Sequence, residues 1–461
     1  MKSPSRLAPG TMDRHIRVMM SHLAADLVSA AVKAGADAAE AIDAEHQALS
    51  VNVRLGALEE VEREEARDLS LRVFVGRRQA TVSGSDISPE GRTRLVERAV
   101  AMARMAPEDP WAGLVDPDGQ ARGPHPALDL FDPADPDPET LEGLAREAEA
   151  AALDMPRIAN TEGGSASSSR SVWRLATSNG FFGEHRATGF HVGASVIAGE
   201  GEGMEGGYDG LSRRWFSDLP APHEVGREAA RRAAGRLGAR KIASTTAPVI
   251  FENRIAMALI GPLLGAISGP SVARGVSFLK DRLGQAVFSA DVTLVDDPHL
   301  ARGLGSAPFD DEGAVNQRMA LIEAGVLTTW LHNVASARQL GMALTGHASR
   351  GSAGPSGVGT SNLTLQPGTQ DLAGLMSGAG AGLLVTSMFG PSLNANTGDW
   401  SVGCSGFWFE NGEIAYPVSE ITVAGSLPDI YARLIPGADL ENRGSANSPS
   451  LLVDGLAIAG K

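Results

Sequence analysis

The chain has 461 residues, 43% of them hydrophobic and 21% charged, and a formal net charge of −15. This length predicts two or three domains, since a single hydrophobic core rarely grows so large. The acidic balance argues against a nucleic-acid-binding protein, because a phosphate-binding face needs clustered Lys and Arg.

The composition indicates a cytoplasmic chain. Its single cysteine, Cys404, cannot form an internal disulfide and fits a reducing compartment. No apolar run reaches the roughly 18 residues that span a bilayer, so no membrane partner is expected. The N-terminus lacks the apolar segment of a signal peptide, and residues 1–12 are expected to be a disordered extension.

The region after this extension predicts a helix, an antiparallel sheet and a second helix. Apolar residues at helical spacing predict the first helix over 13–35, ending at Gly35. A second helix is expected over about 90–106. Alternating apolar and polar residues predict four strands between the helices, centred on 50–55, 58–64, 68–75 and 78–83. This order is typical of an α+β domain.

A proline-rich loop and further strands and helices complete the N-terminal half. The prolines of 107–138 exclude a regular helix or central strand there. Asp137 is the expected N-cap of a following helix over 138–154, and Asn179-Gly180 predicts a hairpin turn. Glycine-rich 199–210 is expected to be a turn or loop. The remaining expected elements are strands at 157–162, 170–178 and 185–198 and a helix over 222–240.

The C-terminal half is expected to be a strand-rich, β-barrel or sandwich-like domain. Apolar 255–267 is a helix candidate interrupted by Gly261-Pro262, and 248–251 is a short buried strand. Hairpins are predicted around Ala324-Gly325 and Asn411-Gly412, the latter a type I′ turn. The expected domain boundary near 240 divides the chain into an N-terminal α+β domain, 13–240, and a C-terminal domain, 241–461.

Few residues point to chemistry by themselves. His223-Glu224 begins like a zinc-binding helix, but Arg227 stands where a second histidine should follow. The arginines between 227 and 236 are interpreted as a solvated helix face. For His347 the alternatives are a structural loop residue, which is favoured, and a substrate-binding residue. For Cys404 they are a buried small residue, again favoured, and a nucleophile.

Segments spread along almost the whole chain resemble one known family. In this order and spacing they are similar to the TldD/PmbA family of metallopeptidase subunits, and specifically to its PmbA/TldE branch. The segments that carry the resemblance are 69–83, 102–110, 266–269, 277–280, 302–305, 336–347 and 396–425.

The resemblance implies a non-catalytic subunit. In the family, a TldD-like sister carries a helical His-Glu-x-x-x-His motif and a later cysteine that bind zinc. Here the aligned positions are Ile260, Gly261 and Gly265, so neither a catalytic residue nor a metal ligand is expected in this chain, and zinc is expected in the partner. The implied partners are the sister subunit, or a second copy when the chain is alone, and an unfolded or extended peptide substrate.

The residues expected to line the peptide cavity are His347, Thr360, Asn362, Asn396, Thr397 and Asp399. Two alternatives remain. The chain could be a peptide-binding or adaptor protein without peptidase activity, or a cysteine hydrolase that uses Cys404 with His347.

Overall fold

The computed structural model describes residues 23–351, 354 and 356–460. The expected extension 1–12 and the first part of the helix predicted over 13–35 lie outside these residues. Within the described part, no helix is both long and apolar enough to cross a bilayer.

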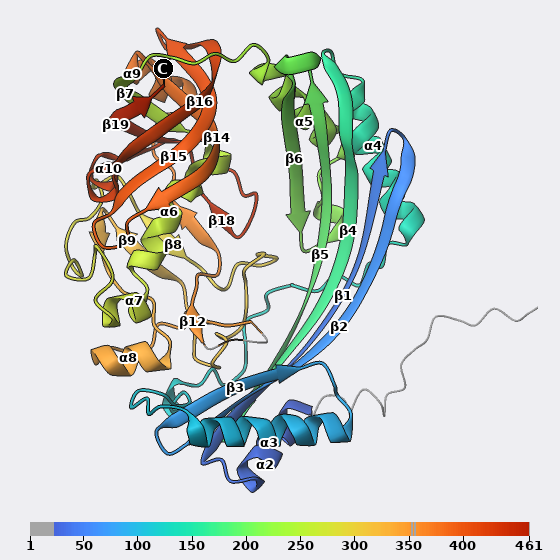
Figure 1. Ribbon diagram of the computed structural model, residues 1–461, viewed down its shortest axis with the longest axis vertical. Helices are drawn as coiled ribbons and strands as arrows, with labels where there is room; N and C mark the ends of the chain where they lie inside the picture. Colours follow the sequence, from blue (N-terminus) through green and yellow to red (C-terminus); the bar gives the residue numbers. More distant parts are fainter. Residues whose placement is uncertain (1–22, 352–353, 355, 461) are drawn as a thin grey trace, which may run out of the picture.

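The N-terminal half is built on one long, curved antiparallel sheet (Figure 1). It contains six strands in the order β3-β2-β1-β4-β5-β6, so β3 and β6 are its edges. Its strands are β1 (Ala38–Arg54), β2 (Ala57–Val75), β3 (Arg78–Gly84), β4 (Ile158–Thr177), β5 (Phe182–Ala198) and β6 (Glu205–Arg213).

Two of these strands are longer than the sequence pattern predicted. The separate strands expected at 58–64 and 68–75 are one strand, β2, and those expected at 157–162 and 170–178 are one strand, β4. The apolar alternation lapses between the paired segments, but the backbone of each strand continues its hydrogen-bonded ladder with β1. Backbone pairing does not require apolar side chains, so a polar stretch can remain a strand.

Four helices cover this sheet. Helices α2 (Leu23–Lys33) and α3 (Pro89–Met105) pack at one end, and α4 (Pro138–Leu153) and α5 (Pro222–Arg236) lie beside each other near the other end (Figure 1). The predicted N-cap of α4 is confirmed, because the Asp137 carboxylate accepts a hydrogen bond from the Thr140 amide. The proline-rich segment before α4 is irregular apart from one short 3-10 turn.

Glycines in β6 and α5 serve close packing. The loop expected over 199–210 is wrong in its second half, where β6 begins at Glu205. A Cβ on Gly207 would lie 2.3 Å from the Ala229 carbonyl oxygen, so only glycine lets α5 rest on this strand. Gly226 of α5 packs against α4 in the same way, since a Cβ on it would lie 1.9 Å from the Ala148 carbonyl oxygen.

The C-terminal half contains a closed five-stranded barrel, which confirms the strand-rich expectation. The strand order is β16-β15-β14-β7-β19, and β16 also pairs with β19 to close the ring. The barrel strands are β7 (Thr245–Phe251), β14 (Ala381–Leu393), β15 (Asp399–Glu410), β16 (Glu413–Ser426) and β19 (Leu451–Ala459). The predicted Asn411-Gly412 turn joins β15 to β16, with φ of 52° and 80°.

Helix α6 (Asn253–Ala266) follows β7 directly and is continuous, so the predicted interruption at Gly261-Pro262 is wrong. Pro262 cannot donate to the carbonyl of Ala258, but Ala258 is exposed and its carbonyl can be solvated. The buried face of α6, which includes Leu259, Ile260 and Leu263, joins the core of the barrel.

Short elements complete the C-terminal half. A five-stranded sheet of order β10-β9-β8-β13-β18 lies beside the barrel, and the predicted Ala324-Gly325 turn joins two of its strands. Its strands are β8 (Leu294–Asp296), β9 (Met319–Glu323), β10 (Val326–Leu327), β13 (Leu363–Leu365) and β18 (Ala446–Asn447). The other elements are β11 (Ala348–Ser349), β12 (Gly357–Val358), β17 (Ile435–Pro436), α7 (Gly269–Ala273), α8 (Val334–Leu340), α9 (Leu372–Ala379) and α10 (Leu427–Arg433).

Candidate functional site

A pocket of about 390 Å³ lies where the long sheet meets the barrel domain, and we call it the interdomain pocket. One wall comes from β4, β5, β6 and α5, and the other from the start of α6 and the middle of β14. Its polar lining includes Glu162, Ser195, Arg232, Arg236, Arg254 and Thr386. Ile255 and Met388 add an apolar patch on the barrel side.

A smaller cavity of about 130 Å³ shares Tyr208 and Arg254 with the interdomain pocket. Its lining also includes Asp209 and Arg443, which form an ion pair. Burial raises the pKa of the Asp209 carboxyl, while the nearby Arg443 guanidinium opposes that shift. Two charged side chains of this cavity's lining therefore already neutralise each other.

Two of the three arginines of the interdomain pocket, Arg232 and Arg254, are paired with glutamates. Arg232 lies 2.6 Å from a Glu228 oxygen and 3.6 Å from Glu252, and Arg254 lies 3.4 Å from Glu252. Burial lowers the pKa of Arg232 and raises that of Glu252, because both charged forms lose hydration. Arg232 is thus a partly buried, paired cation, with a side chain that is 10% exposed, and the interpretation of this arginine cluster as solvated is wrong at that position.

The positions aligned with a zinc motif lie further along α6 than Arg254 and Ile255, the residues of that helix that line the interdomain pocket. Ile260 is fully buried in the barrel core, whereas Gly261 and Gly265 are exposed, with no atom within 4 Å of the position that a Cβ would take. An aliphatic side chain and two glycines offer no ligand atom, and Ile260 also faces away from the two glycines. These residues do not fit a zinc ion.

The described residues also lack a metal site elsewhere: none of their histidine, cysteine, aspartate and glutamate side chains form a group of three or more that could hold a metal ion. Gly269, the residue that fixes the alignment of α6 with the family motif, is tightly enclosed. A Cβ there would lie 2.5 Å from His332 Nδ1 and 2.7 Å from the Leu331 carbonyl oxygen. Close packing therefore explains why this position is glycine.

Two of the predicted cavity residues are buried in the C-terminal half. His347 is 4% exposed and its Nε2 lies 3.3 Å from an Asp296 carboxylate oxygen. The Asn362 side chain accepts from the Gly305 amide and donates to the Ser306 hydroxyl. Both side chains therefore stabilise the segments around β8 and β13.

The other four predicted residues are more accessible. Asn396, Thr397 and Asp399 are exposed at the turn between β14 and β15, where the Thr397 hydroxyl donates to the Asp399 carboxylate at 2.7 Å. Thr360 is half-buried. None of the six predicted residues lines the interdomain pocket. Their role in a peptide cavity stays a prediction.

The sequence interpretation missed the residues that do line this pocket. Arg232 and Thr386 are 154 positions apart in the sequence and meet only because β14 approaches α5. One signal could have found Arg232: it follows the buried Ala229 by three residues, which places it at the flank of the buried face of α5. No local pattern marks Thr386.

Cys404 lies in β15 and is fully buried. Burial raises the pKa of its thiol to about 12, so the thiolate form is strongly disfavoured. This environment agrees with a core role and disfavours the thiolate that a nucleophile needs.

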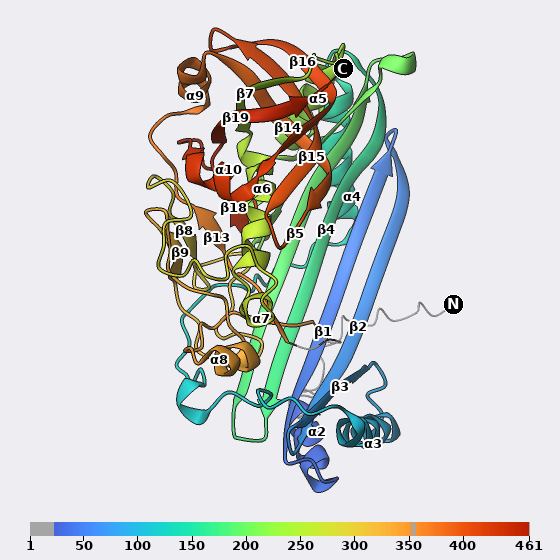
Figure 2. The same ribbon diagram turned by 60° about the vertical axis from the view of Figure 1, so that its left-hand side comes forward.

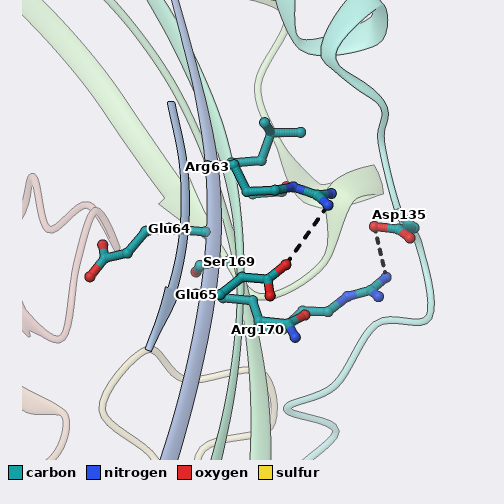
Figure 3. A pocket seen from close by; sticks show the side chains of 10 residues that line it. Arg63, Glu64, Glu65, Asp135, Ser169 and Arg170 are labelled. Atoms are coloured by element: carbon teal, nitrogen blue, oxygen red, sulfur yellow. Dashed lines mark ion pairs between the residues drawn. The ribbon is translucent and has the colours of Figure 1, made fainter. Parts of the chain in front are cut away.

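Charged side chains that line a further hollow on the long sheet form ion pairs with oppositely charged neighbours (Figure 3). Arg63 lies 3.9 Å from Glu65, and Arg170 lies 3.3 Å from Asp135. Glu64 points away from the hollow, on the other face of β2 (Figure 3). These pairs leave little charge for a ligand, in contrast to the interdomain pocket.

Comparison with known proteins places this architecture in a family context. Residues 45–103, 131–237 and 244–460 match, in turn, domain 1, the central domain and the C-terminal domain of the PmbA/TldA metallopeptidases. The chain is 40% identical to Metalloprotease PmbA of Escherichia coli O157:H7 over 92% of this chain and 93% of that protein. It is 38% identical to the Metalloprotease PmbA homolog of Haemophilus influenzae over 94% of each chain.

Solved structures share the fold over nearly the whole chain. A Bacteroides thetaiotaomicron protein, named in connection with modulation of DNA gyrase, superposes with a TM-score of 0.88 at 28% identity, covering 95% of this chain and 98% of that one. TldE from Thermococcus kodakarensis superposes with a TM-score of 0.83 at 20% identity, covering 95% of this chain and all of that one, which shows a shared fold.

Proposed function

The chain belongs to the PmbA/TldD metallopeptidase family, and on this premise we propose that it is the non-catalytic subunit of a zinc metallopeptidase. In this proposal a TldD-like sister subunit holds the zinc and performs the cleavage. The present chain shapes the cavity that receives an unfolded or extended peptide.

The observation that carries the proposal is the composition of α6. Its exposed face presents Gly261 and Gly265, and the residue aligned with the first zinc ligand, Ile260, is buried in the core. Peptide hydrolysis at a zinc site needs ligands and a general base, and these positions supply neither. A chain of this family with such a helix needs a partner to cleave peptides.

Free strand edges support a peptide-binding role. Strand β6 is an edge of the long sheet, and β14 pairs with β7 only over Leu383–Val385, so the following residues of β14 have one free edge. Both edges contribute residues to the interdomain pocket. An extended peptide can add to such an edge through backbone hydrogen bonds.

Mixing the purified chain with a co-expressed TldD-like sister tests the proposal. We expect no cleavage of an unfolded peptide by this chain alone and chelator-sensitive cleavage by the pair. Cleavage by the lone chain, and above all chelator-sensitive cleavage, would contradict the proposal.

An adaptor without peptidase activity is the second candidate. It is favoured by the same observation, since the interdomain pocket contains binding groups but the described residues supply no metal cluster. A sister that binds the chain without gaining activity would support this second function.

A further inference from the structure

We propose that the interdomain pocket binds the free C-terminal carboxylate of an extended peptide. The inference deepens the proposed function and rests on it for the peptide class of the ligand. Arg236, Arg254 and Thr386 would hold the carboxylate, and Ile255 and Met388 would contact the side chain of the last residue.

Three polar atoms in the lining residues of the pocket have no hydrogen-bond partner among the described residues. Thr386 is 9% exposed, and its hydroxyl is buried without a hydrogen-bond partner. The Nε atoms of Arg232 and Arg254 are likewise buried and unpartnered. A buried donor without a partner costs roughly 1–3 kcal/mol, so such groups are commonly completed by a ligand or by water.

Arg236 is the arginine of the lining that has no carboxylate partner among the described residues. Three arginines and a single glutamate, Glu162, line the pocket of a chain whose net charge is −15. Glu162 accepts a hydrogen bond from Ser195. Glu252, behind the lining, contacts Arg232 and Arg254, but the described residues place no carboxylate within 4 Å of Arg236. The Arg236 guanidinium donates to the Gly206 carbonyl at 3.3 Å and retains further donors.

The shape and lining favour a peptide end over an inorganic anion. A volume of about 390 Å³ lies at the small end of ligand pockets, which suits one or two residues. Phosphate would use the arginines but leave Ile255 and Met388 uncovered. An amino acid with an apolar side chain and a free carboxylate would use both parts, and the edges of β6 and β14 would receive the chain leading to it.

The two other charged hollows do not share these properties. In the hollow on the long sheet, Arg63 pairs with Glu65 and Arg170 with Asp135 (Figure 3). In the smaller cavity next to the interdomain pocket, Arg443 pairs with Asp209. A partly unpaired cation therefore distinguishes the interdomain pocket.

Fluorescence anisotropy on the intact chain tests the proposal. The probe is a short alanine- and serine-rich peptide that ends in leucine, labelled at its N-terminus, prepared once with a free C-terminal carboxylate and once with a C-terminal amide. We expect the acid to bind at least roughly ten-fold more tightly than the amide, as for the loss of one charge-assisted hydrogen bond. N-acetyl-leucine should compete with the acid more effectively than inorganic phosphate does.

Matched variants assign the effect to the pocket. Arg236→Gln removes a lining cation that donates a hydrogen bond to a backbone carbonyl and, among the described residues, forms no ion pair within 4 Å, so the fold should be retained. It should weaken binding of the acid roughly ten-fold and leave the amide unchanged, and Arg236→Lys should restore part of the difference. Arg227→Gln is the control, because it removes the same charge from an exposed position of the same helix.

Equal binding of acid and amide would overturn the proposal, as would an acid preference that survives Arg236→Gln. Stronger competition by phosphate than by N-acetyl-leucine would make this an inorganic-anion site and would also overturn it. The binding experiment needs no sister subunit. A negative result would therefore overturn the carboxylate site only, and the proposed function would still be tested by sister-dependent cleavage.

Discussion

The exposed face of α6 yields a stability prediction that can be worked out from the structure. Gly265 lies in the last turn of α6, is exposed, and has no atom within 4 Å of the position that a Cβ would take. Alanine is favoured over glycine by about 0.8–1 kcal/mol in a helix interior, and roughly half of that applies near a helix end. We therefore expect Gly265→Ala to stabilise the chain by about 0.5 kcal/mol.

Thermal and urea unfolding of the intact chain measure this effect. A gain of this size corresponds to a rise of roughly 1–2 °C in Tm for a domain of this length. Gly226→Ala is the opposite control, because its Cβ would lie 1.9 Å from the Ala148 carbonyl oxygen and should destabilise the chain by about 3 kcal/mol. Gly261→Ala is less informative, because Pro262 crowds the Cβ of the residue before it.

A loss of stability on Gly265→Ala would refute the reasoning. It would mean that other parts of the chain contact α6 at Gly265 and leave no room for a Cβ there. The expected gain would mean that glycine at position 265 makes the chain less stable than alanine would, and that packing within the subunit does not require glycine there.

Three further predictions follow from buried groups. Burial raises the pKa of Asp311 from 3.8 to about 6, so the folded chain favours the protonated carboxyl. The free energy of unfolding should therefore fall as the pH rises from about 4 to about 6. Urea unfolding of Asp311→Asn should show this pH dependence reduced by up to about 3 kcal/mol. The Cys404 thiol should resist alkylation in the native chain and react fully in denaturant, and rapid native labelling would revive the nucleophile hypothesis. Arg72→Met should cost about 3–5 kcal/mol, because it leaves the buried Glu312 without its ion-pair partner, whereas Glu40 keeps its ion pair with Arg350. Adding Glu312→Gln should recover part of the loss, and an additive double variant would show that Arg72 and Glu312 are not coupled.

Local signals in the sequence predicted the elements that depend on local chemistry. The Asn411-Gly412 turn has the positive φ values that the residue pair favours, and Asp137 caps α4 through its carboxylate. Local patterns did not predict the lengths of strands that depend on pairing with distant residues. Strands β2 and β4 continue through polar stretches because β1 pairs with them there.

The interdomain pocket was beyond sequence reasoning for the same reason. Arg236 lies on α5 and Thr386 on β14, and only the approach of the barrel to the long sheet brings them together. The barrel lies near one end of the long sheet, beside β6, and α3 lies at the other end (Figure 1). Figure 2 shows the same arrangement from a second direction. By contrast, the unsuitability of Ile260, Gly261 and Gly265 for zinc could be read from residue types alone.

The most direct test of the partner-subunit account is the zinc content of the lone chain, purified without chelator and measured by inductively coupled plasma mass spectrometry. The account predicts substoichiometric zinc that is unchanged by Gly265→Ala. One zinc per chain would contradict it, and would require a site built from residues other than those on α6.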